Sequence, residues 1–150
     1  MFTSHPFLRT AVVVGVVTAA LAACGQMRAA GSSETFEAKL SGAQEVPPVS
    51  NPGTGSAEVQ FNKDTNMLTW KVTYSGLSGP AMAGHIHGPA AMGASAGVVV
   101  PFTNITAQPV QGQATITPAQ AADLAAGKWY VNIHTAANPS GEIRGQLQRR

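Results

Sequence analysis

Two stretches organise this 150-residue chain: His85-Ile86-His87-Gly88-Pro89-Ala90 and its counterpart Trp129-Tyr130-Val131-Asn132-Ile133-His134-Thr135. In an extended strand, successive side chains point to opposite faces. Ile86 therefore points away from the two histidines beside it, and Ile133 points away from His134. If both isoleucines face a core, all three imidazoles lie on the other side of their strands and converge if those strands are neighbours. Apart from His5, these are all the histidines of the chain.

The rest of the chain predicts more short strands. Alternating apolar residues indicate strands over 35–40, 56–61 and 68–74, the last two forming a hairpin. The two histidine strands span 82–87 and 129–135, and further strands are expected over 98–100, 113–117 and 142–148. Between them, Thr117 as N-cap, Pro118 and Gln120 predict one helix over 119–126. The expected fold is all-β: an antiparallel β-sandwich or barrel of about eight short strands with one short helix.

Composition supports a turn-rich β protein and excludes one class of partner. The chain has 16 glycines, 10 prolines and only 11% charged residues. The formal net charge is +2, and no cluster of Lys and Arg with interleaved aromatic residues occurs. We therefore expect no nucleic-acid binding. The Pro/Gly-rich segment 41–55 is expected to be a structured loop with Val46 and Val49 buried.

The N-terminal 24 residues have the pattern of an export signal. An apolar run over 11–21 ends in Leu21-Ala22-Ala23-Cys24-Gly25, which resembles the lipobox of bacterial lipoproteins, and Cys24 is the only cysteine. The expected organisation is a signal peptide over 1–24 with a lipidated Cys24, a flexible tether over 25–34 and a folded domain over 35–150. An ordinary signal peptide cleaved after Ala20-Leu21-Ala22 is the alternative. Either signal exports the domain, and the lipid would anchor it to a membrane of the bacterial cell envelope.

Five motifs together resemble the CHRD domain, a module named after chordin that is widespread in exported bacterial proteins. They occupy residues 42–49, 83–90, 124–127, 130–135 and 138–147. The resemblance covers about residues 35–147 and implies an all-β extracytoplasmic module, with no generally established activity. A weaker likeness to copper/zinc superoxide dismutases rests on the His-x-His pair alone. Three histidines are too few for the two-metal centre of that enzyme, so we expect no dismutase activity by that mechanism.

The histidines are the candidate functional residues. His85, His87 and His134 would form a half-shell for one copper or zinc ion, with copper favoured. Water or one of Met82, Met92 and Glu45 would be the fourth ligand of the ion. Asn132 and Thr135 would orient the His134 ring through hydrogen bonds.

The alternative is a non-enzymatic interaction module in which the histidines only fasten loops. No nucleophile or close carboxylate pair is visible, so we expect no enzyme, although a mononuclear metal-dependent redox activity stays open. Glu142 and Arg144, two residues apart, are expected to form a surface ion pair.

Overall fold

The computed structural model of the protein describes residues 1–2 and 32–150. Residues 3–24 of the proposed signal peptide, with Cys24, and most of the expected tether lie outside these residues. In the described part of the chain, no helix is long and apolar enough to cross a membrane.

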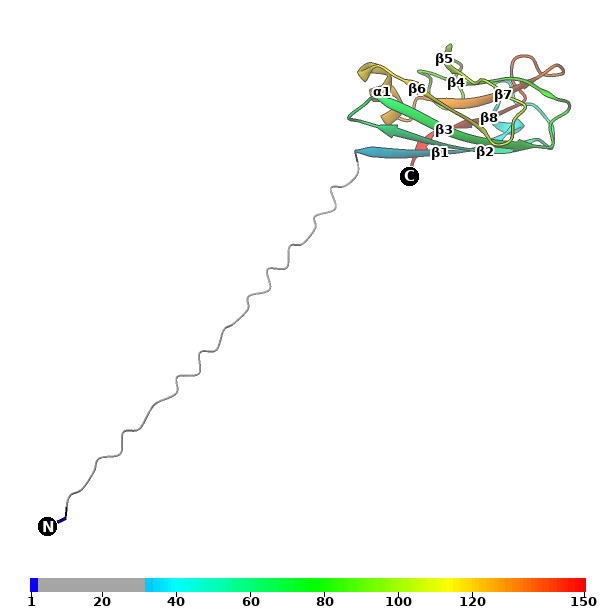
Figure 1. Ribbon diagram of the computed structural model, residues 1–150. Coiled ribbons are helices and arrows are strands. Elements are labelled where there is room, and N and C mark those ends of the chain that lie inside the picture. Colours follow the sequence, from blue (N-terminus) through cyan, green and yellow to red (C-terminus); the bar gives the residue numbers. More distant parts are fainter. Residues whose placement is uncertain (3–31) are drawn as a thin grey trace.

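All strands belong to one antiparallel sheet that is nearly closed into a barrel (Figure 1). The order along it is β5-β4-β7-β8-β1-β2-β3-β6, and β9 pairs with β1. The bounds are β1 Ser33–Ser41, β2 Thr54–Asn62, β3 Met67–Ser75, β4 Ala81–His87, β5 Val98–Pro101, β6 Val110–Thr115, β7 Tyr130–Thr135, β8 Ile143–Gln146 and β9 Gln148–Arg149. In Figure 1, β1 and β2 lie on the lower side of the domain and β4 and β7 on the upper side. The prediction of an all-β antiparallel fold with one short helix is confirmed.

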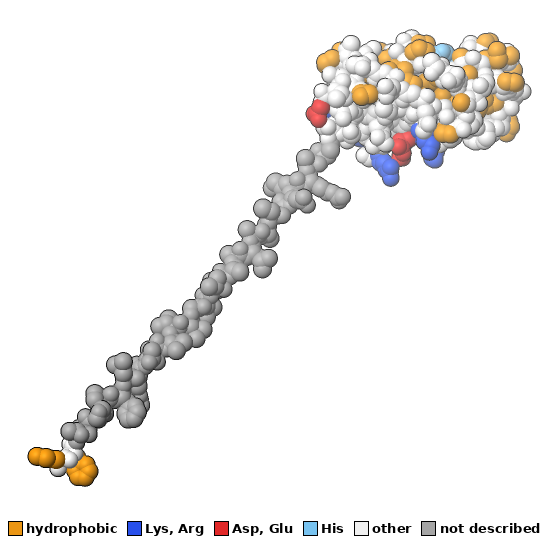
Figure 2. Space-filling model, in the orientation of Figure 1, with side chains coloured by type: hydrophobic (Ala, Val, Ile, Leu, Met, Phe, Trp, Pro, Cys, Tyr) orange, Lys and Arg blue, Asp and Glu red, His pale blue; other side chains and the backbone are white. Residues whose placement is uncertain are grey.

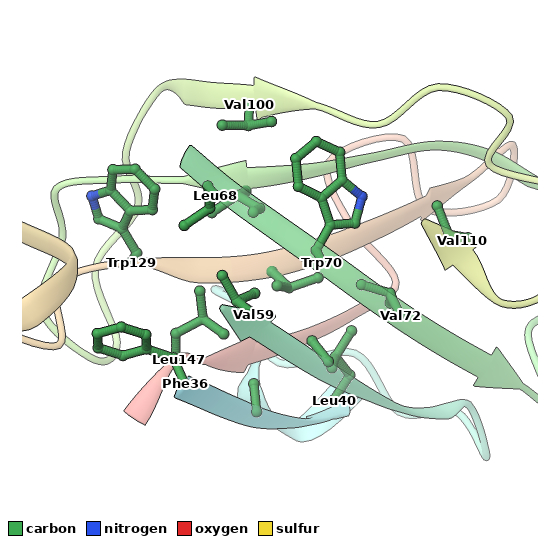
Figure 3. Close-up of a cluster of buried hydrophobic side chains, with 14 of the residues drawn as sticks. Phe36, Leu40, Val59, Leu68, Trp70, Val72, Val100, Val110, Trp129 and Leu147 are labelled. Carbon is green, nitrogen blue, oxygen red and sulfur yellow. The ribbon is translucent and has the colours of Figure 1, made fainter. Parts of the chain in front are cut away.

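The core fills the space inside this curved sheet. Alternation puts one side chain in two on the inner face, as in β1, where Phe36, Ala38 and Leu40 are buried. Figure 3 shows Trp70 and Trp129 within the core on either side of Leu68. Ile86, Val131 and Ile133 are fully buried, as the alternation of the histidine strands predicts. That burial turns the histidines to the outer face.

The one α-helix of residues 32–150, α1 Pro118–Ala125, begins as its sequence predicts. Thr117 accepts a hydrogen bond from the Gln120 backbone N–H at 3.2 Å, and the Gln120 side chain accepts one from the Thr117 N–H at 2.8 Å. These two bonds form a capping box, which satisfies N–H groups that have no partner within the helix. A short 3-10 helix, η1 Gly42–Gln44, follows β1.

Several strand boundaries differ from the predictions. β1 begins at Ser33, two residues inside the expected tether. β6 begins at Val110, which pairs with Val72, and ends at Thr115, before the chain turns into the cap of α1. The last predicted strand divides in two at Leu147: β8 pairs with both β7 and β1, and β9 pairs with β1 alone.

Candidate metal centre

The two histidine strands are neighbours, and their three imidazoles meet. β4 pairs antiparallel with β7, with His85 opposite Asn132, His87 opposite Tyr130 and Ala83 opposite His134. One ligand nitrogen from each of the three histidines lies within 4.8 Å of the other two. The condition for convergence, that the two strands are neighbours, is therefore met, and the three histidines form the expected group. Figure 2 shows histidine atoms at the upper surface of the domain, on the side opposite the charged side chains visible below.

Two backbone carbonyls determine which ring nitrogens are free. His87 Nδ1 lies 3.1 Å from the Ala96 carbonyl oxygen, and His134 Nδ1 lies 3.0 Å from that of Pro139. Because a carbonyl oxygen only accepts, each Nδ1 carries the proton of a neutral ring and donates it. The Nε2 atoms of both rings therefore keep a lone pair. Histidines that bind metal ions in proteins usually have this arrangement: the ring nitrogen that does not bind the metal donates a hydrogen bond to a carbonyl or carboxylate.

The third ring completes the cluster through a histidine–histidine contact. His85 Nδ1 lies 3.0 Å from His134 Nε2. Since His134 is protonated on Nδ1, His85 donates its Nδ1 proton to this Nε2 in the metal-free protein. The Nε2 of His87 is buried and has no hydrogen-bond partner among the described residues. A buried acceptor without a partner costs free energy, and a metal ion would satisfy it.

All three histidines are held in the neutral form. Burial lowers the pKa of His85 to about 4, and the nearby His134 and His87 contribute to the decrease. Burial also lowers the pKa of His87 and of His134, although their bonds to carbonyls act in the opposite direction. Metal coordination requires neutral imidazole. Because the three rings are already neutral at neutral pH, no proton has to leave the cluster before an ion binds.

A stack of aromatic and cationic groups supports His87. Its ring lies parallel to that of Tyr130, with centroids 4.9 Å apart, and the Arg144 guanidinium carbon lies 3.5 Å from the Tyr130 centroid. The Tyr130 hydroxyl accepts from the Ala96 N–H at 3.1 Å. Tyr130 thus positions both the His87 ring and the residue whose carbonyl orients it. Sequence reasoning missed this role, because the Ala96 contact depends on the path of the loop.

The three expected additional ligands lie in different surroundings. Glu45 is outside the three-histidine group and accepts a hydrogen bond from Asn132 Nδ2 at 2.8 Å. Burial raises its pKa from 4.5 to about 7, against the lowering effects of Arg144 and two hydrogen bonds. Met82, on β4, and Met92, in the loop over 88–97, are 64% and 72% exposed. The expectation that Val46 and Val49 are buried was wrong: Val46 is 42% exposed and Val49 is half-buried, because the loop buries Glu45 instead.

Asn132 and Thr135 were expected to orient the His134 ring, but they form hydrogen bonds with other residues. Asn132 donates to Glu45, and Thr135 donates its hydroxyl proton to Glu142. The Pro139 carbonyl orients His134 instead. This correction has a structural cause: residues 136–142 fold back over the end of β7, which places the carbonyl beside the ring.

The predicted surface ion pair between Glu142 and Arg144 is also wrong. Both side chains are buried, at 0% and 3% exposure, and no ion pair joins them. Glu142 accepts from Ser78 Oγ at 2.5 Å and from Asn138 Nδ2 at 3.0 Å, besides Thr135. Burial alone would raise the pKa of Glu142, but these hydrogen bonds outweigh it and lower the pKa to about 2. Glu142 thereby fastens the turn that orients His134.

The donor set suits a borderline or soft divalent ion. Three neutral imidazole nitrogens match the ligands of Zn²⁺ and Cu²⁺ sites that keep an open position. A zinc–nitrogen bond of about 2.0–2.1 Å requires the rings to approach one another slightly. The orphaned His87 Nε2 and the carbonyl-held rings show that these residues fit such an ion.

Comparison with known proteins identifies the family. The family model of the CHRD domain matches residues 36–147. The comparisons with curated proteins and with solved structures gave no significant match. The matched region contains all three histidines of the cluster and Glu45, Tyr130 and Arg144 around it. The chain therefore belongs to the CHRD domain family.

Proposed function

We propose that this protein is an exported, lipid-anchored envelope protein that binds one transition metal ion, copper in preference to zinc, through His85, His87 and His134. The observation that carries the proposal is the convergence of three neutral imidazoles, with ligand nitrogens within 4.8 Å of one another. Two of the rings are already oriented by carbonyls. Little reorganisation is then needed on binding.

The preference for copper follows from the donor atoms. Nitrogen sites bind Cu²⁺ more tightly than the neighbouring divalent ions of the first row. Water would occupy the fourth position, and an exposed methionine such as Met82 or Met92 would extend tolerance to Cu⁺ if its loop or strand end approached. No enzymatic activity is proposed. A mononuclear metal-dependent redox activity is the alternative, and metal-loaded protein that is inert toward superoxide and peroxide would exclude it.

Titration calorimetry with the purified chain tests metal binding. Cu²⁺ should bind with a stoichiometry of one and more tightly than Zn²⁺. His87→Ala should reduce the affinity at least tenfold, and so should His134→Ala. Gln111→Ala, at an exposed position on β6, is the matched control and should bind as the wild type does. Absence of stoichiometric binding, or binding that is the same in the His87→Ala protein, contradicts the proposal.

The anchor requires a separate test because Cys24 lies outside the described residues. Cells expressing the protein should incorporate labelled palmitate into it, and Cys24→Ser should abolish the incorporation. Fractionation should place the labelled protein in the membranes. A label that persists in Cys24→Ser protein would show that the lipid is attached elsewhere. Unlabelled protein of the secreted size would favour the ordinary signal peptide.

A second candidate is a non-enzymatic interaction module whose histidines are structural. The hydrogen bonds of His87 to Ala96 and of His134 to Pro139 favour it, because they fasten the loop 88–97 and the turn 136–142 to the sheet. Under this interpretation, His87→Ala and His134→Ala should lower the melting temperature of metal-free protein by several degrees. Unchanged melting temperatures would exclude the structural role, and metal binding would be judged separately by calorimetry.

A further inference from the structure

A cavity of about 380 Å³ lies between the segment 43–48 and the loop 88–97, beside β8. Its apolar lining includes Val46, Pro48 and Met92, and its polar lining includes Glu45, Arg144 and Gln146. No histidine lines it, so it is separate from the metal centre. Its size and mixed lining resemble those of small-molecule sites, which are concave and mostly apolar with a few polar groups.

Arg144 is the unusual member of this lining. Its side chain is 3% exposed, yet its one hydrogen bond among the described residues is from Nη2 to the Ala94 carbonyl at 2.6 Å. A guanidinium has five N–H donors, so most of them have no protein acceptor. No carboxylate of the described residues lies within ion-pair distance of Arg144, whereas buried charges in proteins are usually paired.

The neighbouring carboxyl of Glu45 supplies a counter-charge only in part, because it is not within ion-pair distance and is about half protonated at neutral pH. Glu45 is 6% exposed and bonds to Asn132 rather than to Arg144. Because burial raises its pKa to about 7, much of it is protonated at neutral pH and carries no charge. The cavity therefore presents a guanidinium whose charge Glu45 compensates only in part, and a carboxyl that in its protonated form can donate a proton to a bound anion.

We propose that this cavity binds a small aliphatic monocarboxylate, whose carboxylate accepts hydrogen bonds from Arg144 and whose short chain packs against Val46, Pro48 and Met92. The planar guanidinium matches the two oxygens of a carboxylate, which favours this anion over a halide or a cation. The volume of about 380 Å³ is ample for a carboxylate with a short aliphatic chain. Val46 and Met92 are 42% and 72% exposed, so the apolar wall is open to solvent where a ligand would enter.

The test uses hexanoate as the probe and metal-free protein in the presence of a chelator. In a ¹H–¹⁵N NMR titration, hexanoate should give saturable shifts with a millimolar dissociation constant, centred on Val46, Gly93 and Arg144. Hexan-1-ol and hexylamine have the same chain without the anion and should bind at least tenfold more weakly. Equal binding of the alcohol or the amine would overturn the assignment of a carboxylate, and the absence of saturable shifts would overturn the site.

Substitutions test whether the residues that line the cavity bind the probe. Arg144→Gln should weaken hexanoate binding at least tenfold, while Arg150→Gln, an exposed arginine at the C-terminus, should not change it. Since Arg144 also stacks on Tyr130, Met92→Glu provides an independent test with an exposed residue. The added negative charge at the cavity should weaken binding severalfold, and Met82→Glu, an exposed methionine on β4 outside the lining, should leave it unchanged. Equal effects of Met92→Glu and Met82→Glu would overturn the proposed location.

Discussion

Glu45 is a buried carboxyl whose ionisation opposes folding. Its pKa is raised from 4.5 to about 7, so the folded state binds more protons than the unfolded state between these pH values, and stability falls as the pH rises through this range. Glu45→Gln removes this penalty and keeps a similar shape. At pH 8 the variant should therefore be more stable than the wild type, by at most about 3 kcal/mol, and the difference should disappear only below about pH 4, where the carboxyl of the unfolded chain is protonated too.

Urea denaturation at several pH values measures this difference. Glu37→Gln is the matched control, because Glu37 is exposed and its ion pair with Arg150 joins two exposed groups. Its effect should stay below about 0.5 kcal/mol at every pH. A Glu45→Gln protein that is less stable than the wild type at pH 8 would show that the charged form of Glu45 contributes to the fold.

The lowered pKa values of the three histidines predict that metal binding persists to an unusually low pH. An ordinary histidine has a pKa near 6.5, and protons compete with a metal below that value. Because the pKa of each of the three histidines is lowered, that of His85 to about 4, the affinity should change little between pH 8 and 6. It should fall steeply only as the pH approaches 4. Calorimetric titration at each pH checks this, and a decline that begins at pH 7 would contradict it.

At the scale of elements, the end of β4 depends on a glycine packed against a tryptophan. A Cβ atom added to Gly88 would lie 2.7 Å from Trp129 Nε1, and Trp129 is 1% exposed. Gly88→Ala should therefore displace the end of β4 and destabilise the protein by about 1–3 kcal/mol. It should also weaken metal binding, because His87 is the preceding residue.

Gly97 is the matched control for that substitution. Its carbonyl belongs to the same loop closure, because it accepts a hydrogen bond from the Gly88 N–H at 3.2 Å. A Cβ atom added to Gly97 would meet nothing within 4 Å. Gly97→Ala should change the free energy of unfolding by less than about 0.5 kcal/mol. Similar losses in the two variants would mean that loop flexibility, rather than the Trp129 contact, limits stability.

At the scale of the whole molecule, the strands of the barrel differ in how extensively they are paired with their neighbours. β2 is central, with nine residue pairs to β1 and nine to β3, whereas β5 has three pairs to β4 and no second neighbour. We expect the slowest amide hydrogen exchange in β2 and the fastest strand exchange in β5, because edge strands open locally at lower free energy. Exchange measured by NMR checks this order. Equal protection of β5 and β2 would indicate that the barrel opens only as a unit.

Several features of this protein follow from local sequence. The period of two in β4 and β7 puts Ile86 and Ile133 on the inner face and the histidines on the outer one. Capping chemistry at Thr117 predicts the start of α1, and alternation predicts the β2–β3 hairpin. These features depend on residues close together in the chain, so their physical causes are present in the sequence itself.

Contacts between distant segments were decided only by the tertiary structure. Alternation assigned the histidines to a face but left open which strand lies beside β4, and the pairing with β7 arises from packing of the whole barrel. The carbonyls of Ala96 and Pro139 reach the rings because loops fold over the outer face. Glu45 and Arg144 are buried for the same reason, although polar residues in a loop and on an alternating strand predict exposure. Burial depends on what covers a residue, and here the covering segments come from elsewhere in the chain.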